Sequence, residues 1–220
     1  MFKTREEMHE ALQNIVDLYD NNEVIKVFNT KNNVAIFVID MINDFNFTSA
    51  MKNPLAVKII PKLADMLKKA NNSGKKIYHV NEAHTEDSIE FLNFAPHGKK
   101  GTEGAEIVEE LKKVPYERIF YKNSTNGIHN DDIKKWINEN PQIDTVVVAG
   151  VLADMCALQF AIGLKTYCNE INKKMNVIIP LELVETSDFE GHNRDLFYYM
   201  ALEFMAQGGM EIVKNIDFED

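Results

Sequence analysis

Short apolar runs alternate along this chain with longer segments in which apolar residues recur at helical spacing. The runs are rich in β-branched residues and end at turn residues, as strands buried on both faces do. They predict strands at residues 34–39, 76–80, 117–121, 145–149, 176–179 and 211–213. The periodic segments predict helices at residues 61–72, 104–112, 131–138, 154–167 and 192–206.

The order of these elements, strand then helix several times over, predicts the fold class. Repeated strand–helix units with short connections form parallel sheets that are covered by helices on both faces. We therefore expect an α/β protein with a three-layer α/β/α arrangement and Rossmann-like topology around a mostly parallel six-stranded sheet. Residues 1–20 predict a further amphipathic helix. We accordingly divide the chain into an N-terminal helical extension at residues 1–30 and one domain at residues 31–220.

The composition narrows the class of partner. The chain has 220 residues, 45% of them hydrophobic and 26% charged, as expected for one globular domain with a large core. Its net charge of -10 argues against nucleic-acid binding, which needs clustered basic residues. No apolar run reaches the length of a membrane span, and the charged N-terminus lacks a signal sequence. We therefore expect no membrane partner, a cytoplasmic location and two reduced thiols, Cys156 and Cys168.

Three predicted strands lead at their carboxyl ends to side chains that can do chemistry. Asp40 follows the first strand, Lys122 follows the third, and Cys156 comes soon after the fourth, near the start of a helix. In a parallel sheet all three lie at one edge, where open α/β sheets bind their ligands. A helix N-terminus favours a thiolate, so Cys156 is a candidate nucleophile. Each residue also has a structural interpretation: a turn cap for Asp40, a solvated charge for Lys122 and a small buried side chain for Cys156.

The segments around these three residues, taken in order, resemble the isochorismatase-like cysteine hydrolase superfamily. They are Val-Ile-Asp-Met with Asn-Asp-Phe, then Tyr-Lys-Asn-Ser-Thr-Asn-Gly, then Ala-Gly-Val-Leu-Ala-Asp-Met-Cys, within residues 34–215. The resemblance implies a hydrolase domain with a catalytic triad. Asp40 accepts the thiol proton, Lys122 stabilises the anions, and the Cys156 thiolate attacks a carboxamide carbon. It also implies a cis peptide between Val151 and Leu152, which directs the N–H groups of Leu152 and Cys156 at the oxyanion.

The predicted loop at residues 81–104 carries two histidines and several acidic residues. Its order of Glu82-Ala-His84, then Glu90, then Pro-His97 resembles the metal site of the nicotinamidase family. The resemblance implies one divalent ion, zinc first with manganese or iron as alternatives. The implied ligands are Glu82, His84 and His97, with Glu90 as an additional one. Glu82 stands where relatives have Asp, so its arm is one methylene longer; without the resemblance, a solvated acidic loop is the simpler interpretation.

Three apolar residues are candidates to contact a substrate ring in such a site. Phe45 follows the first strand and Phe91 lies in the loop, and both offer an aromatic face because Ala83 stands where relatives often have an aromatic residue. Val151 precedes the implied oxyanion turn. Core packing is the alternative role for Phe45 and Phe91.

Together these features predict a metal-dependent cysteine amidohydrolase that converts nicotinamide to nicotinate and ammonia in NAD salvage, through a thioester on Cys156. Two alternatives stay open. The same triad serves hydrolases of other small amides, ureides and carbamoyl compounds, and a catalytically idle binding module could keep the same fold. Members of the superfamily are often oligomeric, so we expect a homo-oligomer whose small-molecule partner is nicotinamide.

Overall fold

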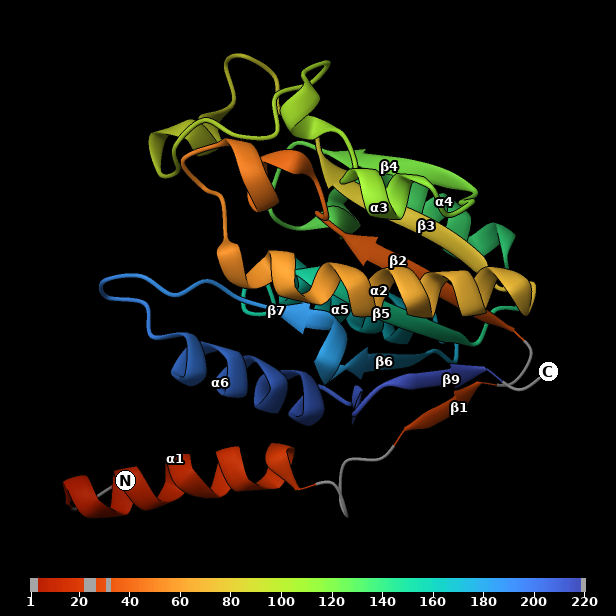
Figure 1. Ribbon diagram of the computed structural model, residues 1–220. Helices are drawn as coiled ribbons and strands as arrows, with labels where there is room; N and C mark the ends of the chain where they lie inside the picture. The colour runs from red at the N-terminus through yellow and green to blue at the C-terminus, as the bar shows by residue number, and fades with distance from the viewer. Residues whose placement is uncertain (1–3, 22–26, 31–32, 219–220) are drawn as a thin grey trace.

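The computed structural model describes residues 4–21, 27–30 and 33–218, and a parallel sheet forms its centre (Figure 1). Six strands lie in the order β4-β3-β2-β5-β6-β8, and all neighbours in this order are parallel. A short strand, β7, pairs with the end of β5. The predicted six-stranded parallel sheet is confirmed. The bounds are β2 (Val34–Ile39), β3 (Lys76–Glu82), β4 (Arg118–Lys122), β5 (Thr145–Val151), β6 (Asn176–Pro180), β7 (Val184–Glu185) and β8 (Glu211–Val213).

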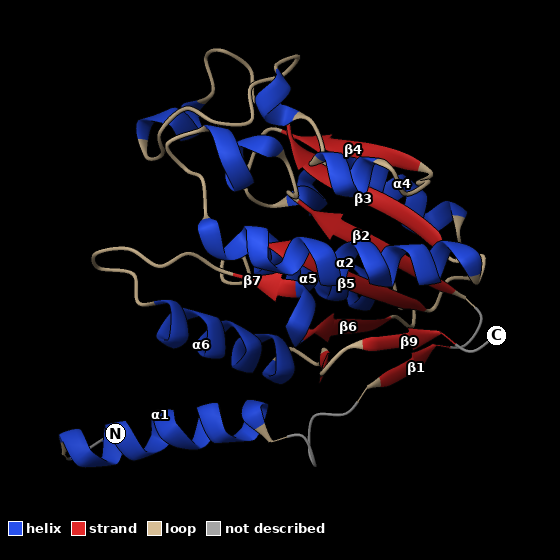
Figure 2. Ribbon diagram, viewed as in Figure 1, coloured by secondary structure: helices blue, strands red, loops and turns tan. Residues whose placement is uncertain are grey.

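Helices cover both faces of the sheet and make the three layers (Figure 2). They are α2 (Pro54–Asn72), α3 (Glu109–Lys112), α4 (Asp131–Glu139), α5 (Cys156–Glu170) and α6 (Arg194–Gln207). Helices α2 and α3 share one apolar core with the sheet, and α4, α5 and α6 share the other. Strand β2 contributes to both cores because its side chains alternate: Phe37 and Ile39 face one, and Ile36 and Val38 face the other. The predicted three-layer arrangement is therefore confirmed.

Helix α2 begins at Pro54 rather than at Pro61, where we expected it to start. Proline favours the first helical position, and both prolines could mark it. Asn53 decides between them, because its side chain accepts a backbone N–H at 3.0 Å and caps the first turn. The buried stripe of the helix also extends upstream of Pro61, through Ala56 and Ile59.

The helix predicted at residues 104–112 is divided into two short pieces. A 3₁₀ helix at Glu103–Ala105 and α3 lie on either side of an isolated antiparallel bridge between Ile42 and Ile107. Both isoleucines are buried. This bridge holds the end of the long loop against the segment that follows β2, and so brings the loop to the edge of the sheet where Asp40 lies.

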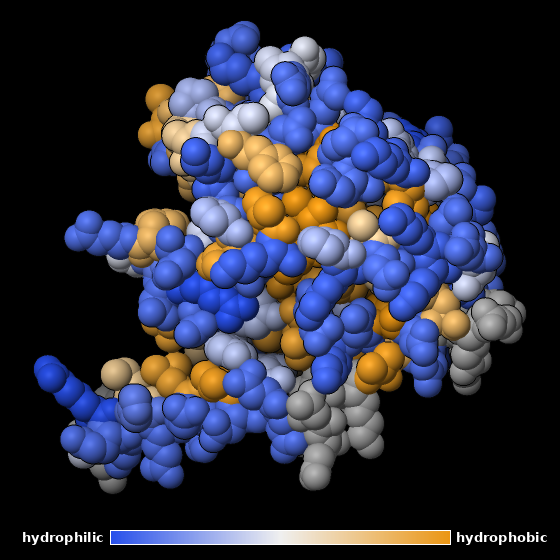
Figure 3. All heavy atoms as spheres, viewed as in Figure 1, coloured by the Kyte–Doolittle hydropathy of each residue, from blue (hydrophilic) through white to orange (hydrophobic). Residues whose placement is uncertain are grey.

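The predicted N-terminal helix is present as α1 (Arg5–Asp20), and residues 1–3 of the prediction lie outside the described residues. It packs along α6, where the Tyr19 hydroxyl donates to Glu203 at 2.9 Å and the Tyr199 hydroxyl donates to Asp20 at 2.7 Å. Hydrophobic side chains of α1 gather on the side that faces α6 (Figure 3). The division of the chain at residue 30 stays a prediction.

A second, two-stranded parallel sheet was not predicted. It pairs β1 (Phe28–Thr30) with β9 (Ile216–Phe218), and so joins segments from opposite ends of the chain. Each strand has only three residues, too few for a periodic signal in the sequence. Among the helices of the described residues, none combines the length and the apolar character needed to cross a membrane.

Candidate active site

The ends of β2 and β4 and the start of α5 bring Asp40, Lys122 and Cys156 together at one edge of the sheet. Strand β2 lies between β3 and β5, where the strand order reverses, and open α/β sheets bind ligands at this switch point. Asp40 has a left-handed backbone, with φ of 51°, which Asp tolerates better than most residues. All three side chains are buried, so a solvated role for Lys122 is excluded.

Lys122 is the centre of this cluster. Its Nζ lies 2.8 Å from Asp40 Oδ2, 2.8 Å from Glu82 Oε1 and 3.7 Å from Cys156 Sγ. Burial alone would lower the pKa of Lys122, but the negative charge of Asp40 and its neighbours outweighs burial and raises it. Lys122 therefore stays cationic and stabilises whichever of these groups carries negative charge.

The two other members of the triad hold protons more tightly than usual. Burial raises the pKa of Asp40 to about 6, because desolvation outweighs the attraction of Lys122. Burial also raises the pKa of the Cys156 thiol well above its ordinary value, with Lys122 opposing the shift and the carboxylates adding to it. We expected the helix N-terminus to favour a thiolate at this sulfur. The raised pKa instead keeps Cys156 in its thiol form at rest. The thiol needs a proton acceptor, and a carboxylate with a pKa near neutrality suits that role.

Glu82 contacts all three residues of the triad and also belongs to the predicted metal site. The sequence predicted only its place in the metal site. Its backbone N–H donates to Asp40 Oδ1 at 2.8 Å. Its Oε1 accepts from Lys122 at 2.8 Å and from the Cys156 thiol at 3.5 Å. Its Oε2 lies 2.8 Å from His97 Nε2 and 3.2 Å from His84 Nε2. Glu has one methylene more than Asp. This extra length places the Glu82 carboxylate between the triad and the two histidines.

The charge of Glu82 follows from these partners. Burial alone would raise the pKa of its carboxyl, but Lys122 and the two histidines lower it well below the usual range. Glu82 is therefore ionised, and it can serve as a metal ligand without first losing a proton.

Glu82, His84, Glu90 and His97 form the metal-site cluster that the sequence predicted. One ligand atom from each residue lies within 4.8 Å of the others, and only Glu90 is more than slightly exposed. Glu90 Oε2 lies 3.6 Å from His84 Nε2, and its other oxygen accepts a backbone N–H from the segment after β4 at 2.8 Å. Imidazole and carboxylate ligands together suit zinc, manganese or iron.

Hydrogen bonds fix the two imidazole rings of this cluster. His97 Nδ1 lies 2.7 Å from the Ala95 carbonyl oxygen, which can only accept, so Nδ1 carries the hydrogen. His84 Nδ1 lies 3.2 Å from both Ser88 Oγ and Asn123 Oδ1. Metal-binding histidines are typically oriented in this way through the second nitrogen. Both Nε2 atoms are thereby directed at Glu82.

Three buried atoms of the cluster have no hydrogen-bond partner within the described part of the chain: Glu82 Oε2, His84 Nε2 and Glu90 Oε2. Atoms with lone pairs stabilise one another at these distances only through a proton or a cation. Consistent with this, Glu82 raises the pKa of His97, although burial alone would lower it. A divalent cation would satisfy all of these atoms together, so the residues present fit such an ion.

The turn between β5 and α5 presents two free N–H groups. The Val151–Leu152 peptide is cis, as the resemblance implies. Among the described residues, no backbone acceptor lies opposite the N–H of Leu152 or that of Cys156. The Leu152 carbonyl accepts the N–H groups of Met155 and Ala157, which closes the turn. Two such donors beside a nucleophile can hold an oxyanion.

A narrow cavity of about 40 Å³ opens beside Cys156. Of the three predicted substrate contacts, Phe45 lines this cavity and the other two do not. Phe91 instead packs its ring against His84, with the centroids 5.3 Å apart, and Val151 is a fully buried strand residue. Phe91 therefore packs against a candidate metal ligand, and Val151 belongs to the core.

The cavity is also lined by four residues that the sequence did not indicate: Met51, Phe94, Thr125 and Met155. Met155 precedes the nucleophile directly, so its position in the chain is a usable signal. Met51 and Phe94 come from separate loops, and only the folded chain brings them together. Two flexible methionine side chains at this cavity can adapt to the shape of a ligand.

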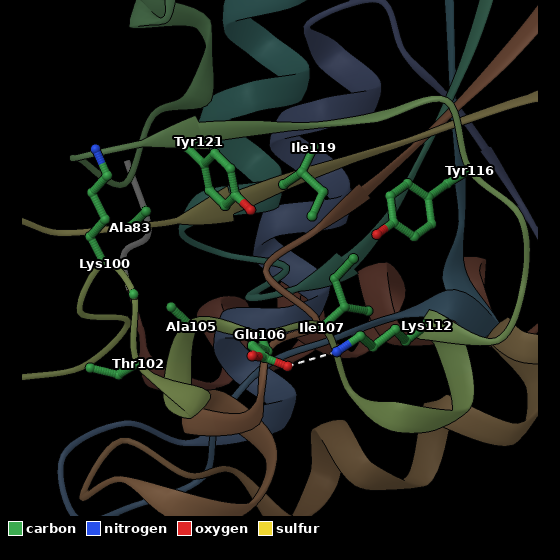
Figure 4. A pocket seen from close by; sticks show the side chains of 11 residues that line it. Ala83, Lys100, Thr102, Ala105, Glu106, Ile107, Lys112, Tyr116, Ile119 and Tyr121 are labelled. Atoms are coloured by element: carbon green, nitrogen blue, oxygen red, sulfur yellow. Dashed lines mark hydrogen bonds and ion pairs between the residues drawn. The ribbon is translucent and has the colours of Figure 1, made fainter.

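A larger cleft, of about 450 Å³, is lined in part by Ala83, the residue between Glu82 and His84 in the chain (Figure 4). Ala83, Ile119 and Tyr121 line it, because successive side chains of an extended chain point to opposite sides. None of the predicted site residues lines this cleft. We take the smaller cavity as the candidate active site, because Cys156, Glu82 and His97 all line it.

The parallel sheet and this cluster define an isochorismatase-like α/β protein. The sequence model of the isochorismatase domain matches residues 34–212, which include every residue of the candidate site. The chain therefore belongs to the isochorismatase family.

Two curated relatives and one solved structure illustrate the range of this family. The chain is 32% identical over 124 residues to the uncharacterized isochorismatase family protein YddQ of Bacillus subtilis, covering 56% of this chain and 64% of that protein. It is 23% identical to Nicotinamidase 1 of Arabidopsis thaliana, covering 88% of this chain and 90% of that protein. The pyrazinamidase of Pyrococcus horikoshii in complex with zinc is 25% identical, with a TM-score of 0.68, covering 83% and 99% of the two chains.

Proposed function

We propose that this protein is a metal-dependent cysteine amidohydrolase that converts nicotinamide to nicotinate and ammonia. The observation that carries the proposal is the position of Glu82, which joins the nucleophile cluster to the metal-site cluster through one carboxylate. A carboxamide held beside a cation at these residues would lie next to the thiol, because Glu82 contacts both Cys156 and His97. Similarity to a zinc-bound pyrazinamidase and to a plant nicotinamidase supports this substrate class.

In the first half of the reaction, the Cys156 thiol gives its proton to a neighbouring carboxylate, and the thiolate attacks the carboxamide carbon. We assign the proton to Asp40, whose pKa near 6 lets it both accept and return a proton. The N–H groups of Leu152 and Cys156 bind the oxyanion, and each such donor typically lowers the barrier by about 3–4 kcal/mol. Asp40 then protonates the leaving nitrogen, and ammonia departs from a thioester.

In the second half, a water molecule attacks the thioester carbon while Asp40 accepts its proton. The C–S bond breaks, and Asp40 returns its proton to the sulfur, which restores the Cys156 thiol. The acid product loses its remaining proton to solvent and leaves as nicotinate. Glu82, His84 and His97, with Glu90, are the residues that would hold a divalent ion, zinc first. Such an ion supplies a Lewis acid that can bind the ring nitrogen of the substrate.

The direct test is ammonia release from nicotinamide by the purified protein, before and after chelation. We expect release to fall on chelation and to return with Zn²⁺, Mn²⁺ or Fe²⁺, and we expect pyrazinamide to be a substrate because it keeps the ring nitrogen and the carboxamide. Activity that is indifferent to exhaustive chelation would remove the metal from the proposal. No release from folded, metal-supplied protein would remove nicotinamide as the substrate.

A second candidate is the hydrolysis of a smaller amide, ureide or carbamoyl compound by the same triad. The narrow cavity beside Cys156 favours it, because a substrate without a ring needs less room between Met51 and Met155 than nicotinamide does. A panel of such compounds, assayed for ammonia release beside nicotinamide, distinguishes the two substrates by their kcat/KM values. The third candidate, a catalytically idle binding module, requires that no compound in this panel is turned over.

The activity is expected to depend on pH through Asp40. Because the base must be ionised and its pKa is raised to about 6, kcat/KM should fall as the pH decreases through this value. Below it the loss approaches about tenfold per pH unit, as for one essential base. Initial rates of the metal-supplied protein across this range give the profile. A kcat/KM that stays constant well below pH 6 would exclude Asp40 as the proton acceptor.

A further inference from the structure

The turn at residues 152–155 carries one candidate oxyanion donor and leads directly to the other, yet it contains no proline to stiffen it. Contacts with the segment around β7 fix its position instead. The Ala153 N–H donates to the Glu185 carbonyl oxygen at 2.9 Å, and β7 itself pairs with the end of β5. Catalytic groups must be held within about 0.5 Å of their productive positions. The contacts that hold this turn therefore bear on the reaction.

Asp154 ties the side of this turn to the segment that follows β7. Its side chain is only 8% exposed. Its Oδ1 accepts a hydrogen bond from the Thr186 hydroxyl, and its Oδ2 lies 2.7 Å from His192 Nε2. The fully buried Thr186 is held independently through its backbone, since its carbonyl accepts from Asn53 at 3.0 Å and its N–H donates to Glu185 at 2.8 Å. Asp154 is thus anchored to a rigid partner.

His192, the other anchor, is also held from several sides. Its Nδ1 lies 3.0 Å from the Ser187 carbonyl oxygen. Its ring stacks between Phe189, with centroids 4.8 Å apart, and Phe197, with centroids 4.0 Å apart. The Ser187 carbonyl oxygen and the Asp154 carboxylate both lie within hydrogen-bond distance of the ring nitrogens. Ring stacking and these two polar contacts hold the partner of Asp154 in place.

We propose that Asp154, Thr186 and His192 form a latch that positions the two oxyanion donors, with Asp154 as the positioning residue. Asp154 lies two residues before Cys156 and does not line the cavity beside the thiol, so it acts through the turn and not on the substrate. The inference rests on the proposed function, because it assigns the latch to the same reaction. Loosening the latch should displace the N–H groups of Leu152 and Cys156, while Lys122 and the cavity-lining residues outside the turn, such as Phe45 and Phe94, keep their places.

The test compares Thr186→Val with Thr186→Ser. Valine nearly matches the shape of threonine but leaves Asp154 Oδ1 without its donor, whereas serine keeps the hydroxyl. We expect Thr186→Val to lower kcat for nicotinamide by about tenfold to a hundredfold with little change in KM, since a donor that stabilises only the transition state is displaced. Thr186→Ser should recover most of this loss. Should Thr186→Val fail to fold, Asp154→Asn, which disrupts the contact with His192, takes its place.

Two measurements that need no amide turnover separate a latch from a general structural role. Alkylation of Cys156 by iodoacetamide reports the thiol, and it should proceed in Thr186→Val at nearly the wild-type rate. Reversible addition of pyridine-3-carboxaldehyde to Cys156 forms an oxyanion, and its affinity should fall about as much as kcat. Unchanged kcat and aldehyde affinity in Thr186→Val would overturn the latch, as would an equal slowing of alkylation. The wild-type protein could release no ammonia from nicotinamide while Thr186→Val still loses affinity for the aldehyde. This result would support the latch and overturn only the proposed substrate.

Discussion

Replacing Cys156 by alanine is expected to reduce ammonia release from nicotinamide by about 10⁴-fold or more, because no second thiol is among the described residues that line the cavity. In the described part of the chain, the only other thiol is Cys168, which is fully buried farther along the same helix. Cys156 is 5% exposed and the change removes only a sulfur atom, so the fold should persist. Ammonia release under saturating substrate, with matched thermal unfolding curves, gives the measurement.

Cys168→Ala is the matched control for this experiment. It removes the same atom from the same helix, at a position in the apolar core and away from the candidate site. We expect a modest loss of stability from the small cavity and turnover close to that of the wild type. Retention of more than about 1% of the wild-type rate in Cys156→Ala would contradict covalent catalysis by this residue.

Replacing Lys122 by methionine is expected to abolish turnover and to destabilise the fold by about 3–5 kcal/mol near neutral pH, since removing one partner leaves buried charge uncompensated. The Lys122 ammonium lies 2.8 Å from both Asp40 and Glu82, and all three side chains are buried. Methionine fills much of the same volume without the charge. The two carboxylates then face each other with no cation between them.

The loss of stability in Lys122→Met should itself depend on pH. Without the cation, the pKa of Asp40 in the folded protein, already raised by burial, rises further, and burial raises the pKa of Glu82 above its value in the unfolded chain. The folded variant then binds more protons than the unfolded chain, so its stability increases as the pH falls. Urea unfolding of both proteins, after chelation, should therefore show a difference that is large at neutral pH and smaller near pH ~5.

Lys76→Met is the matched control for Lys122→Met. Lys76 also forms an ion pair, at 2.7 Å from Glu117, but the side chains of both residues are about half exposed. Solvent screens such a pair, so its loss should change stability little and should not alter turnover. A stability difference for Lys122→Met that stays constant with pH, or that is as small as that of the control, would contradict the proposed buried charge cluster.

The strands, and the meeting of Asp40, Lys122 and Cys156 at one edge of the sheet, could be predicted because their signals are local. An apolar run such as residues 34–39 is buried on both faces wherever it pairs, and parallel strands place their carboxyl ends at one edge. Asp40, Lys122 and Cys156 follow from these two facts, together with their motifs. The boundary of α2 was less certain, because two prolines offered similar starts and the side chain of Asn53 decided between them.

The two-sided role of Glu82 and the anchoring of Asp154 could not be read from the sequence. Glu82 meets Lys122 across 40 residues, and Asp154 meets His192 across 38. No periodicity in the sequence links positions so far apart. By residue type alone, Glu82 and Asp154 could each equally be a solvated surface charge. Their burial follows from how the loops close over the sheet edge.

The sequence by itself determined the α/β layers, the edge of the sheet at which the candidate site lies and the residue types available there. The tertiary structure decided which of these groups share a proton, a cation or a hydrogen bond, and it showed that the cavity beside Cys156 is lined by Phe45 but not by Phe91 or Val151. The physical reason is the distance along the chain over which each effect acts. Backbone periodicity and burial act between neighbours in the chain, whereas desolvation and charge act between whatever side chains the fold brings within a few ångströms.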